Sequence, residues 1–523
     1  MMSGGFRDWR ACLLSGGSAV ALLLPAAPAW AGSGDVLGAT AVAGEIAHAQ
    51  KMGQLFRDPV SGNQATPPVI PPLEIDLDPS GMIATYQPAG PTFTSTNSFF
   101  QNLGTNRRTC FTCHQPQDGW GLSAQHAQDR FAENPTDPLF RLVDGATCPS
   151  DDVSSLEAMR KAYSLVLSKG LIRIGLPMQS SMQFQISSVD DPYGCNNNPT
   201  TGLTGAQSGT ASFYRRPLPS TNLGFLSTIM WDGRESSLFS QAADATLIHA
   251  QASTAPTPAQ QQQIVDFEGC TTAFTPVPCA NTPSGAGLFT AQIVDQSAAY
   301  LAADGASGGP ISLAQELDNF FICVNDPFGC DGQSFSPVIF TAYEAWAGLT
   351  GRDPVTGARL AIARGEEVFN SVPIKITGVA GINDVLNEPS VQGFCGTCHD
   401  TPNAGDHSVK APLNIGVADA GPLAPPVLDI SGLPVFTVLC IAGPLAGETF
   451  QVTDVGRAMI SGNCADIGKT KGPILRGLAA RAPYFHNGSA ATLLDVVNFY
   501  DQRFGIGFTS QQKSDLVAFL NSL

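Results

Sequence analysis

The chain has 523 residues, more than one hydrophobic core usually organises, so the sequence predicts two or three domains. With 43% hydrophobic and only 14% charged residues, it is not an intrinsically disordered protein. The net charge of −17, from 44 acidic and 27 basic residues without a basic cluster, excludes a nucleic-acid partner and favours a basic protein partner.

Residues 1–31 have the features of a secretory signal peptide. Arg7 and Arg10 give a positive start, an apolar run covers 19–24, and a small-x-small cleavage signal covers 29–31. A membrane anchor is the alternative, but glycines and a proline interrupt a run far shorter than the roughly 20 residues that cross a bilayer. We therefore expect an exported chain without a membrane span, and a periplasmic location if the source is a Gram-negative bacterium.

Two pentapeptides have the form C-x-x-C-H, which is typical of covalent haem attachment. They are Cys110-Phe-Thr-Cys113-His114 and Cys395-Gly-Thr-Cys398-His399. In such a motif the two thiols form thioether bonds to the haem vinyl groups, and the adjacent imidazole binds the iron. A zinc site would need the two C-x-x-C pairs roughly 15–20 residues apart, and a thioredoxin-like redox pair would not occur twice with His attached. The sequence predicts two covalently bound haems c.

The motifs divide the mature chain into an extended arm over 32–100, a first haem domain over 101–260, connecting loops over 261–345 and a second haem domain over 346–523. The first domain carries a long insertion after its motif, with a helical stretch predicted over 155–171. The fold class is therefore predicted to be mainly α, with two cytochrome c-like haem domains, long loops and a disulfide-stapled insertion.

Eight further cysteines remain once the signal peptide and the two motifs are set aside. Export would place them in a compartment where disulfides persist. We expect nearest neighbours to pair, as Cys148–Cys195, Cys270–Cys279, Cys323–Cys330 and Cys440–Cys464. Sequence alone cannot fix this pairing.

The second haem domain ends in two predicted helices. The last begins at Ser510, after the capping-box pattern Thr509-x-x-Gln512. The helix before it, for which we expect Ser489 to be the cap, has apolar residues at helical spacing and places Tyr500 on its buried face. Spacing alone is also consistent with a core tyrosine whose hydroxyl is hydrogen-bonded. The side chains considered as the second axial ligand of this haem are His407, Met459, Tyr484, His486 and Tyr500.

Four segments follow one family pattern in order along the chain. They are Gly53-Gln-Leu-Phe-Arg-Asp58, Met230-Trp-Asp-Gly-Arg-Glu235 with Gln241, Ala363-Arg-Gly-Glu-Glu-Val-Phe369, and the stretch from Gly472 to Phe504. They resemble the bacterial di-haem cytochrome c peroxidases and their MauG-type branch. The resemblance implies an oxidoreductase with two haems c that reduces hydrogen peroxide and takes electrons from a small cytochrome or another donor protein.

The resemblance also implies roles for residues near the first haem. Trp231 takes the place of a Trp between the two haems, although a Trp filling an interdomain core fits the same position. Gln241 matches a distal glutamine. Gln251 stands where the family has a catalytic Glu, and an amide cannot exchange a proton as Glu does. His249 is our candidate for that role, since imidazole titrates near neutrality. His126 lies in a stretch where other peroxidases of the family keep a distal His.

Tyr500 falls where the peroxidases carry the distal Met of the electron-donating haem and where MauG-type members carry Tyr. A phenolate is a harder donor than a thioether, so it stabilises oxidised iron. The resemblance thus implies His399 and Tyr500 on the second iron and His114 on an open first iron. A calcium ion bound partly by carbonyls of 481–483 is another family feature, but the family's Asn ligand is missing near Arg216.

Three functions remain open from the sequence. The first is peroxide reduction at the first haem, with the second haem storing or relaying electrons. The second is a di-haem electron-transfer cytochrome without peroxidase activity, in which Gln251 in place of the catalytic Glu would reflect the loss of that activity. The third is a haem oxygenase acting on an organic substrate, with an apolar channel built by the insertion over 115–215.

Overall fold

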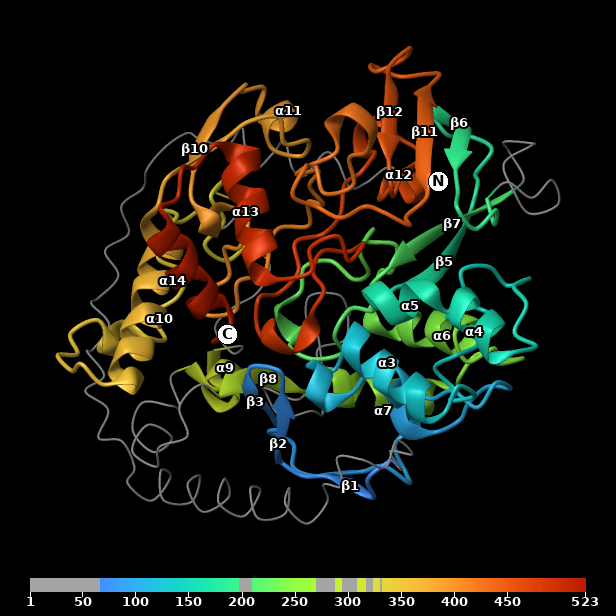
Figure 1. The fold of residues 1–523 in the computed structure, drawn as a ribbon, viewed down its shortest axis with the longest axis horizontal. Helices are drawn as coiled ribbons and strands as arrows, with labels where there is room; N and C mark the ends of the chain where they lie inside the picture. The colour runs from blue at the N-terminus through green and yellow to red at the C-terminus, as the bar shows by residue number, and fades with distance from the viewer. Residues whose placement is uncertain (1–65, 197–208, 270–286, 294–307, 317–322, 330–331) are drawn as a thin grey trace.

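The computed structural model describes residues 66–196, 209–269, 287–293, 308–316, 323–329 and 332–523. The signal-peptide region therefore lies outside the described residues. In the described part, 31% of the residues are helical and 17% lie in strands, so the expectation of a mainly α fold is wrong (Figure 1). The strands are short and lie in Pro- and Gly-rich stretches, where their β-branched and aromatic residues give a weak sequence signal.

Of the described α-helices, the longest is α10 (Pro354–Ser371), which packs against α14 (Ser510–Leu520). The others are α3 (Ala124–Glu133), α4 (Leu156–Ala162), α5 (Ser164–Lys169), α6 (Leu238–Ile248), α7 (Pro258–Glu268), α9 (Pro310–Glu316), α11 (Asn383–Leu386), α12 (Ala458–Ser461) and α13 (Leu493–Phe504). The helical stretch predicted over 155–171 is present as α4 and α5. None of the helices in the described part has the length and apolar character that a membrane crossing requires.

The strands form small antiparallel sheets. One sheet has the order β2-β3-β8, from β2 (Leu73–Asp78), β3 (Gly81–Tyr86) and β8 (Phe289–Ile293). Another has the order β12-β11-β6, from β6 (Phe184–Asp190), β11 (Val435–Cys440) and β12 (Thr449–Val452). The two-stranded sheets pair β1 (Val69–Ile70) with β4 (Thr92–Phe93), β5 (Ile172–Pro177) with β7 (Thr210–Arg215), and β9 (Ile374–Ile376) with β10 (Val391–Gly393).

The sheet of β2, β3 and β8 supports the first haem motif. It brings a strand from the segment after α7 against a hairpin from the N-terminal part of the chain. The hydroxyls of Thr85 on β3 and Thr290 on β8 are hydrogen-bonded at 3.0 Å, and the indole N–H of Trp120 donates to Thr85 at 2.8 Å. The loop after the first motif is therefore anchored on this sheet.

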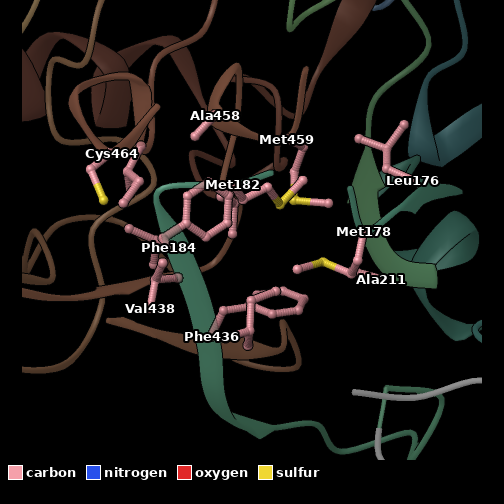
Figure 2. Packing of buried hydrophobic residues seen from close by; sticks show 14 of the residues in the cluster. Leu176, Met178, Met182, Phe184, Ala211, Phe436, Val438, Ala458, Met459 and Cys464 are labelled. Carbon is pink, nitrogen blue, oxygen red and sulfur yellow. The ribbon is translucent and has the colours of Figure 1, made fainter. Parts of the chain in front are cut away.

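The sheet of β6, β11 and β12 joins the two halves of the chain. Phe436 on β11 lies opposite Val189 on β6, and its ring is 4.8 Å from that of Phe213 on β7. Figure 2 shows the apolar core built here by β5, β6 and β7 from the first half and by β11 and α12 from the second. Met459 belongs to this core and is only 1% exposed, so its side chain packs among apolar neighbours.

Helices α10 and α14 approach closely at Gly365. A Cβ at this position would lie 2.0 Å from the carbonyl oxygen of Asp515 on α14, so only glycine fits. Beside it, the Arg364 guanidinium makes two hydrogen bonds of 2.8 Å to the Asp515 carboxylate. These contacts set the crossing of α10 and α14.

The two C-terminal helices test the capping predictions. The capping box of Thr509 and Gln512 is confirmed, and α14 begins at Ser510. The expectation that Ser489 caps α13 is wrong. Thr492 is the cap, because its hydroxyl accepts from the N–H of Asp495 while the Asp495 carboxylate accepts from the N–H of Thr492.

The disulfides follow the predicted nearest-neighbour pattern where they are described. Cys148–Cys195 and Cys440–Cys464 are confirmed. Cys323 is disulfide-bonded, but Cys330 lies outside the described residues. The predicted Cys270–Cys279 pair also lies outside them.

Candidate haem-binding and redox site

The two C-x-x-C-H motifs fold in the same way. Each begins as a single 3₁₀ turn, η2 (Cys110–Thr112) and η8 (Cys395–Thr397). In both, the backbone N–H of the histidine donates to the carbonyl of the first cysteine at 3.1 Å. The turn therefore places two thiols and one imidazole close together, and none of the four motif cysteines takes part in a disulfide.

The imidazoles of His114 and His399 are held in the same tautomer. Nδ1 of His114 is 2.9 Å from the carbonyl oxygen of Trp120, and Nδ1 of His399 is 2.8 Å from that of Gly405. Since a carbonyl only accepts, Nδ1 carries the hydrogen and Nε2 keeps its lone pair for a metal. Burial lowers the pKa of both histidines to about 4, which keeps the rings neutral.

The two residues whose carbonyls accept these hydrogen bonds stand six residues after their histidines and share a left-handed backbone. The φ angle is 56° at Trp120 and 70° at Gly405. A Cβ at Gly405 would lie 2.8 Å from the ring of Phe340, which explains the glycine there. We did not single out either residue from the sequence, although their equal spacing from the two motifs is a signal that could have identified them.

A cavity of about 150 Å³ adjoins the first motif. Helix α6 lines it with one face, through residues at helical spacing: Leu238, Gln241, Ala242, Ala245, Thr246 and His249. The small side chains of this face leave space between Gln241 and His249. Trp231 and His114 line the same cavity, so the structure brings these predicted site residues together.

Gln251 and His126 do not line this cavity. The side-chain oxygen of Gln251, on the exposed turn after α6, accepts a hydrogen bond from Asn106 at 3.3 Å. His126 lies on α3 with Nδ1 2.7 Å from a carboxylate oxygen of Asp118. Both residues are thus engaged outside the space beside His114.

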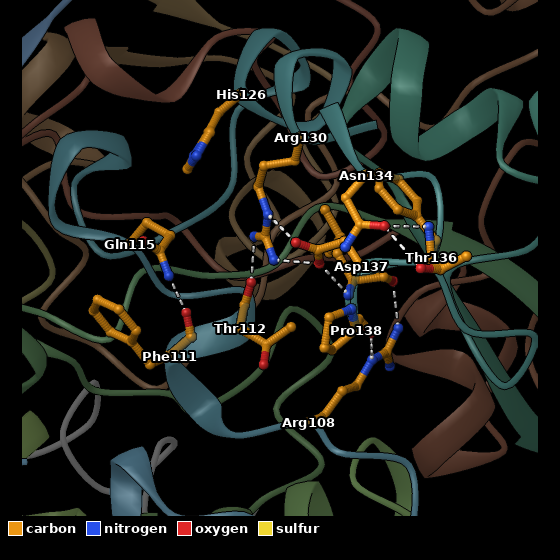
Figure 3. A network of polar contacts seen from close by, with 12 residues as sticks. Arg108, Phe111, Thr112, Gln115, His126, Arg130, Asn134, Thr136, Asp137 and Pro138 are labelled. Atoms are coloured by element: carbon orange, nitrogen blue, oxygen red, sulfur yellow. Dashed lines mark hydrogen bonds and ion pairs between the residues drawn. The ribbon is translucent and has the colours of Figure 1, made fainter. Parts of the chain in front are cut away.

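Helix α3 contacts the first motif through Arg130, as Figure 3 shows. Arg130 donates to the carbonyl of Thr112, inside the motif, and to the carboxylate of Asp137, both at 2.6 Å. The side-chain amide of Gln115 donates to the carbonyl of Phe111. The backbone of the motif is therefore fixed by polar contacts from Arg130 and Gln115.

Sequence reasoning missed two buried carboxylates that line the cavity, because neither belongs to a short motif. Glu268 accepts a hydrogen bond from Ser220 at 2.9 Å, and burial raises its pKa to about 7. Burial alone would raise the pKa of Asp144, but the positive charge of Arg108 and a hydrogen bond from His249 outweigh burial and lower it to about 2. Asp144 is therefore ionised at neutral pH.

The second motif lies in apolar surroundings that Tyr500 reaches from α13. Both motif cysteines pack against a cluster made by Ile374, Ile376, Val379, Ile382 and Leu413. Burial, and then the nearby Cys398 and Cys395, raise the pKa of Tyr500 above its ordinary value. Its hydroxyl has no hydrogen-bond partner among the described residues, which the core-tyrosine alternative would require.

Three other side chains considered for the second iron have different surroundings. The Tyr484 hydroxyl donates to a backbone carbonyl at 3.2 Å. The ring of His486 lies 6.0 Å from that of Trp231, and Nδ1 of His407 lies 3.3 Å from a carboxylate oxygen of Asp400.

Trp231 connects the first cavity with the second motif. Its indole N–H donates to the carbonyl of Arg216 at 2.8 Å, and its own carbonyl accepts from the N–H of Lys471 at 2.9 Å. The next residue, Gly472, packs on the second motif, since a Cβ there would lie 3.6 Å from the carbonyl oxygen of Cys398. A short chain of contacts thus runs from the lining of the first cavity to the second motif.

The chain matches known proteins over parts of its length. Over 140 residues it is 36% identical to cytochrome-c peroxidase IdrP2 of Denitromonas iodatirespirans, which covers 25% of this chain and 36% of that protein. Over 191 residues it is 28% identical to cytochrome c551 peroxidase of Nitrosomonas europaea, which covers 34% of this chain and 48% of that protein. The chain is a relative of these peroxidases.

The matched segments span less than half the length of either relative. No protein-family model matches the chain. A crystal structure of a MauG-like protein associated with microbial copper homeostasis aligns with 81% of this chain and 85% of that one. The sequence identity is 15% and the TM-score 0.32, which is too low to establish a common fold.

The residues around Arg481 do not fit the calcium ion of the peroxidase family. The buried guanidinium of Arg216 donates to the carbonyl of Arg481 at 2.8 Å, to that of Leu122 at 2.6 Å and to that of Lys169 at 3.1 Å. An arginine side chain is permanently charged. A protein cation therefore already binds one of the carbonyls of 481–483, at which calcium was expected.

Proposed function

We propose that the protein is a di-haem c-type oxidoreductase that reduces hydrogen peroxide at the first haem, with a second haem on His399 and Tyr500 that stores or relays electrons. The observation that carries this proposal is the cavity beside His114, which gathers Trp231 and the polar side chains of α6 around space for a small oxidant. The similarity to cytochrome-c peroxidases supports it.

The two motifs have the donor sets that haem c needs. Each offers two thiols outside any disulfide and one neutral imidazole with its Nε2 lone pair available. Haem c, when bound, supplies an iron centre that reacts with peroxide and carries electrons. Tyr500 is our proposed second ligand at the second motif, because burial and the nearby Cys398 and Cys395 raise its pKa and its hydroxyl is not hydrogen-bonded within the described part of the chain.

The cavity residues supply hydrogen bonds and a proton acceptor. The amide of Gln241 donates to an oxidant in the cavity, and the imidazole of His249 accepts and returns a proton. Trp231 lies between the cavity and the second motif, where an aromatic ring shortens the path for an electron. Reducing one hydrogen peroxide to two waters takes two electrons and two protons. We assign Gln251 no role, because it lies outside the cavity lining.

We further propose that the protein is exported and receives electrons from a partner protein. The disulfides Cys148–Cys195 and Cys440–Cys464 suit an oxidising compartment such as the periplasm. The net charge of −17 would attract a basic donor, for example a small cytochrome.

Rapid mixing of the purified holoprotein with hydrogen peroxide tests the activity. We expect the haem absorption to change at once. The oxidised state should persist if the second haem stores oxidising equivalents. It should disappear quickly when a reduced donor cytochrome is present. An unchanged spectrum together with two low-spin EPR signals would show an electron-transfer cytochrome instead. Oxygen uptake with an organic substrate and no peroxide would show an oxygenase.

The role of Tyr500 is tested by EPR of the oxidised Tyr500→Phe variant. We expect one low-spin signal to change, because the phenol oxygen is removed from the second iron. Tyr484→Phe is the matched control, since the Tyr484 hydroxyl is hydrogen-bonded to a backbone carbonyl, and its spectrum should equal that of the wild type. An unchanged spectrum for Tyr500→Phe would exclude Tyr500 as a ligand.

A further inference from the structure

The imidazole of His249 contacts the buried carboxylate of Asp144, and this carboxylate also pairs with the guanidinium of Arg108. Nδ1 of His249 is 2.6 Å from Oδ2 of Asp144, and Oδ1 of Asp144 contacts Nη1 of Arg108. All three residues line the cavity beside the first motif. The chain thus places an ordered Arg–Asp–His series at the edge of the space where the oxidant is proposed to bind.

The arginine in this series is fixed by further contacts. Its side chain is 3% exposed, and it donates to the carbonyls of Pro138 at 2.8 Å and Leu139 at 2.6 Å (Figure 3). Both carboxylate oxygens of Asp144 are engaged, one by Arg108 and one by His249. Neither group can rotate without leaving a buried charge unpaired, so the position of Asp144 is rigid.

The contact with Asp144 also sets the tautomer of His249. An ionised carboxylate only accepts, so Nδ1 of the neutral ring carries the hydrogen and Nε2 has the lone pair. The Nε2 atom has no hydrogen-bond partner among the described residues, and the side chain is 29% exposed. Among the described residues, Asp144, Arg108 and His114 are charged or titratable groups that face His249.

We propose that Asp144 is a positioning residue that fixes the ring of His249 so that Nε2 accepts the proton of a weak acid entering the first cavity. This inference rests on the proposed function and names the residue that orients its proton acceptor. The acid gives its proton to Nε2 and keeps the bonding electrons as an anion. The imidazolium that forms is balanced by the Asp144 carboxylate, as in the carboxylate–imidazole pairs of other enzymes.

Cyanide binding to the ferric holoprotein tests this step without turnover, because hydrogen cyanide must lose its proton to bind as an anion. At neutral pH we expect His249→Gln and Asp144→Asn each to slow cyanide binding by about 10–100-fold. The double variant should be no slower than either single variant, because Asp144 acts through His249. Carbon monoxide binding to the ferrous protein involves no proton, and its rate should be the same in all variants.

Asp515→Asn is the matched control. Asp515, on α14 and away from the first cavity, is also buried and paired with an arginine, Arg364, at 2.8 Å, and no histidine in the described part of the chain contacts it. Its cyanide rate should equal that of the wild type. If Asp144→Asn does not fold, Asp144→Glu keeps the charge beside Arg108 but displaces the oxygens, and should also slow cyanide binding.

Two results would overturn the positioning role. One is a wild-type cyanide rate in a folded Asp144 variant, and the other is a double variant slowed by the product of the two single effects. Failure of the proposed function gives a different result: a wild-type protein that binds neither cyanide nor carbon monoxide has no accessible iron, which overturns both proposals together.

Discussion

At each C-x-x-C-H motif one backbone carbonyl decides which nitrogen of the histidine keeps its lone pair. At the first motif that carbonyl belongs to Trp120, a non-glycine residue with a φ of 56°. The left-handed conformation costs roughly 1–2 kcal/mol, which the buried indole and its hydrogen bond to Thr85 offset. The cysteines and histidines were predictable because their motif is local, whereas Trp120, Gly405 and Asp144 act through backbone conformation or distant contacts.

Glu366 on α10 is a buried carboxyl group whose ionisation should weaken the fold. It is 3% exposed and accepts the N–H of Tyr343 at 3.0 Å, and burial raises its pKa from 4.5 to about 7. The pKa of Glu366 in the folded protein lies above its pKa in the unfolded chain. The carboxyl group therefore contributes its full stabilisation below the unfolded pKa, and this stabilisation is lost as the pH rises through the folded pKa.

We therefore expect Glu366→Gln to be more stable than the wild type at alkaline pH, by about 3 kcal/mol at most, and nearly equal to it at about pH 5. Urea unfolding at the two pH values measures the difference. A stability change of the same size at both pH values would show that ionisation of Glu366 is not its cause.

Among the elements, the ends of helices could be predicted from the sequence better than the pairing of strands. The capping box of Thr509 and Gln512 predicts where α14 begins, and this pattern is local because it spans only four residues. Strands β6 and β11 pair although the bonded residues Ser187 and Thr437 are 250 positions apart. No short pattern encodes such a partner, so the sheets were missed and the fold class was wrong.

The crossing of α10 and α14 should depend on Gly365. We expect Gly365→Ala to lower the free energy of unfolding by about 1–3 kcal/mol, because the new methyl group meets the backbone of α14. Gly357→Ala is the control on the same helix, where a Cβ meets no atom within 4 Å, and should be neutral or stabilising. Thermal unfolding measures the stability of both variants. Equal changes in stability would mean that α10 and α14 can move apart without destabilising the protein.

Across the whole molecule, the two halves that carry the C-x-x-C-H motifs are held together by polar contacts as well as by the shared sheet. Arg215 binds Asp232 at 2.5 Å and Asp454 at 2.6 Å, with all three side chains buried. Arg216 adds its contact with the carbonyl of Arg481. The sequence indicated two haem units from their motifs, but the resemblance to a family placed calcium where an arginine side chain lies.

A chelator should therefore leave this protein intact. We expect excess EGTA to cause no change in the melting temperature of the holoprotein, and elemental analysis to find no stoichiometric calcium. Arg216→Gln should lower the melting temperature, because buried carbonyls lose their donor, and added calcium should not restore it. A melting temperature that falls on chelation would show that calcium binds elsewhere or beside Arg216.

The pairing of β6 with β11 bears on how an electron would move between the two haems. Strands from both halves belong to one sheet, so main-chain hydrogen bonds fix the spacing of the two motifs where a hinge would let it vary. Transfer between the haems would then need no swing of one half against the other. The rate of electron transfer between the haems should be the same in dilute buffer and in a viscous sucrose solution.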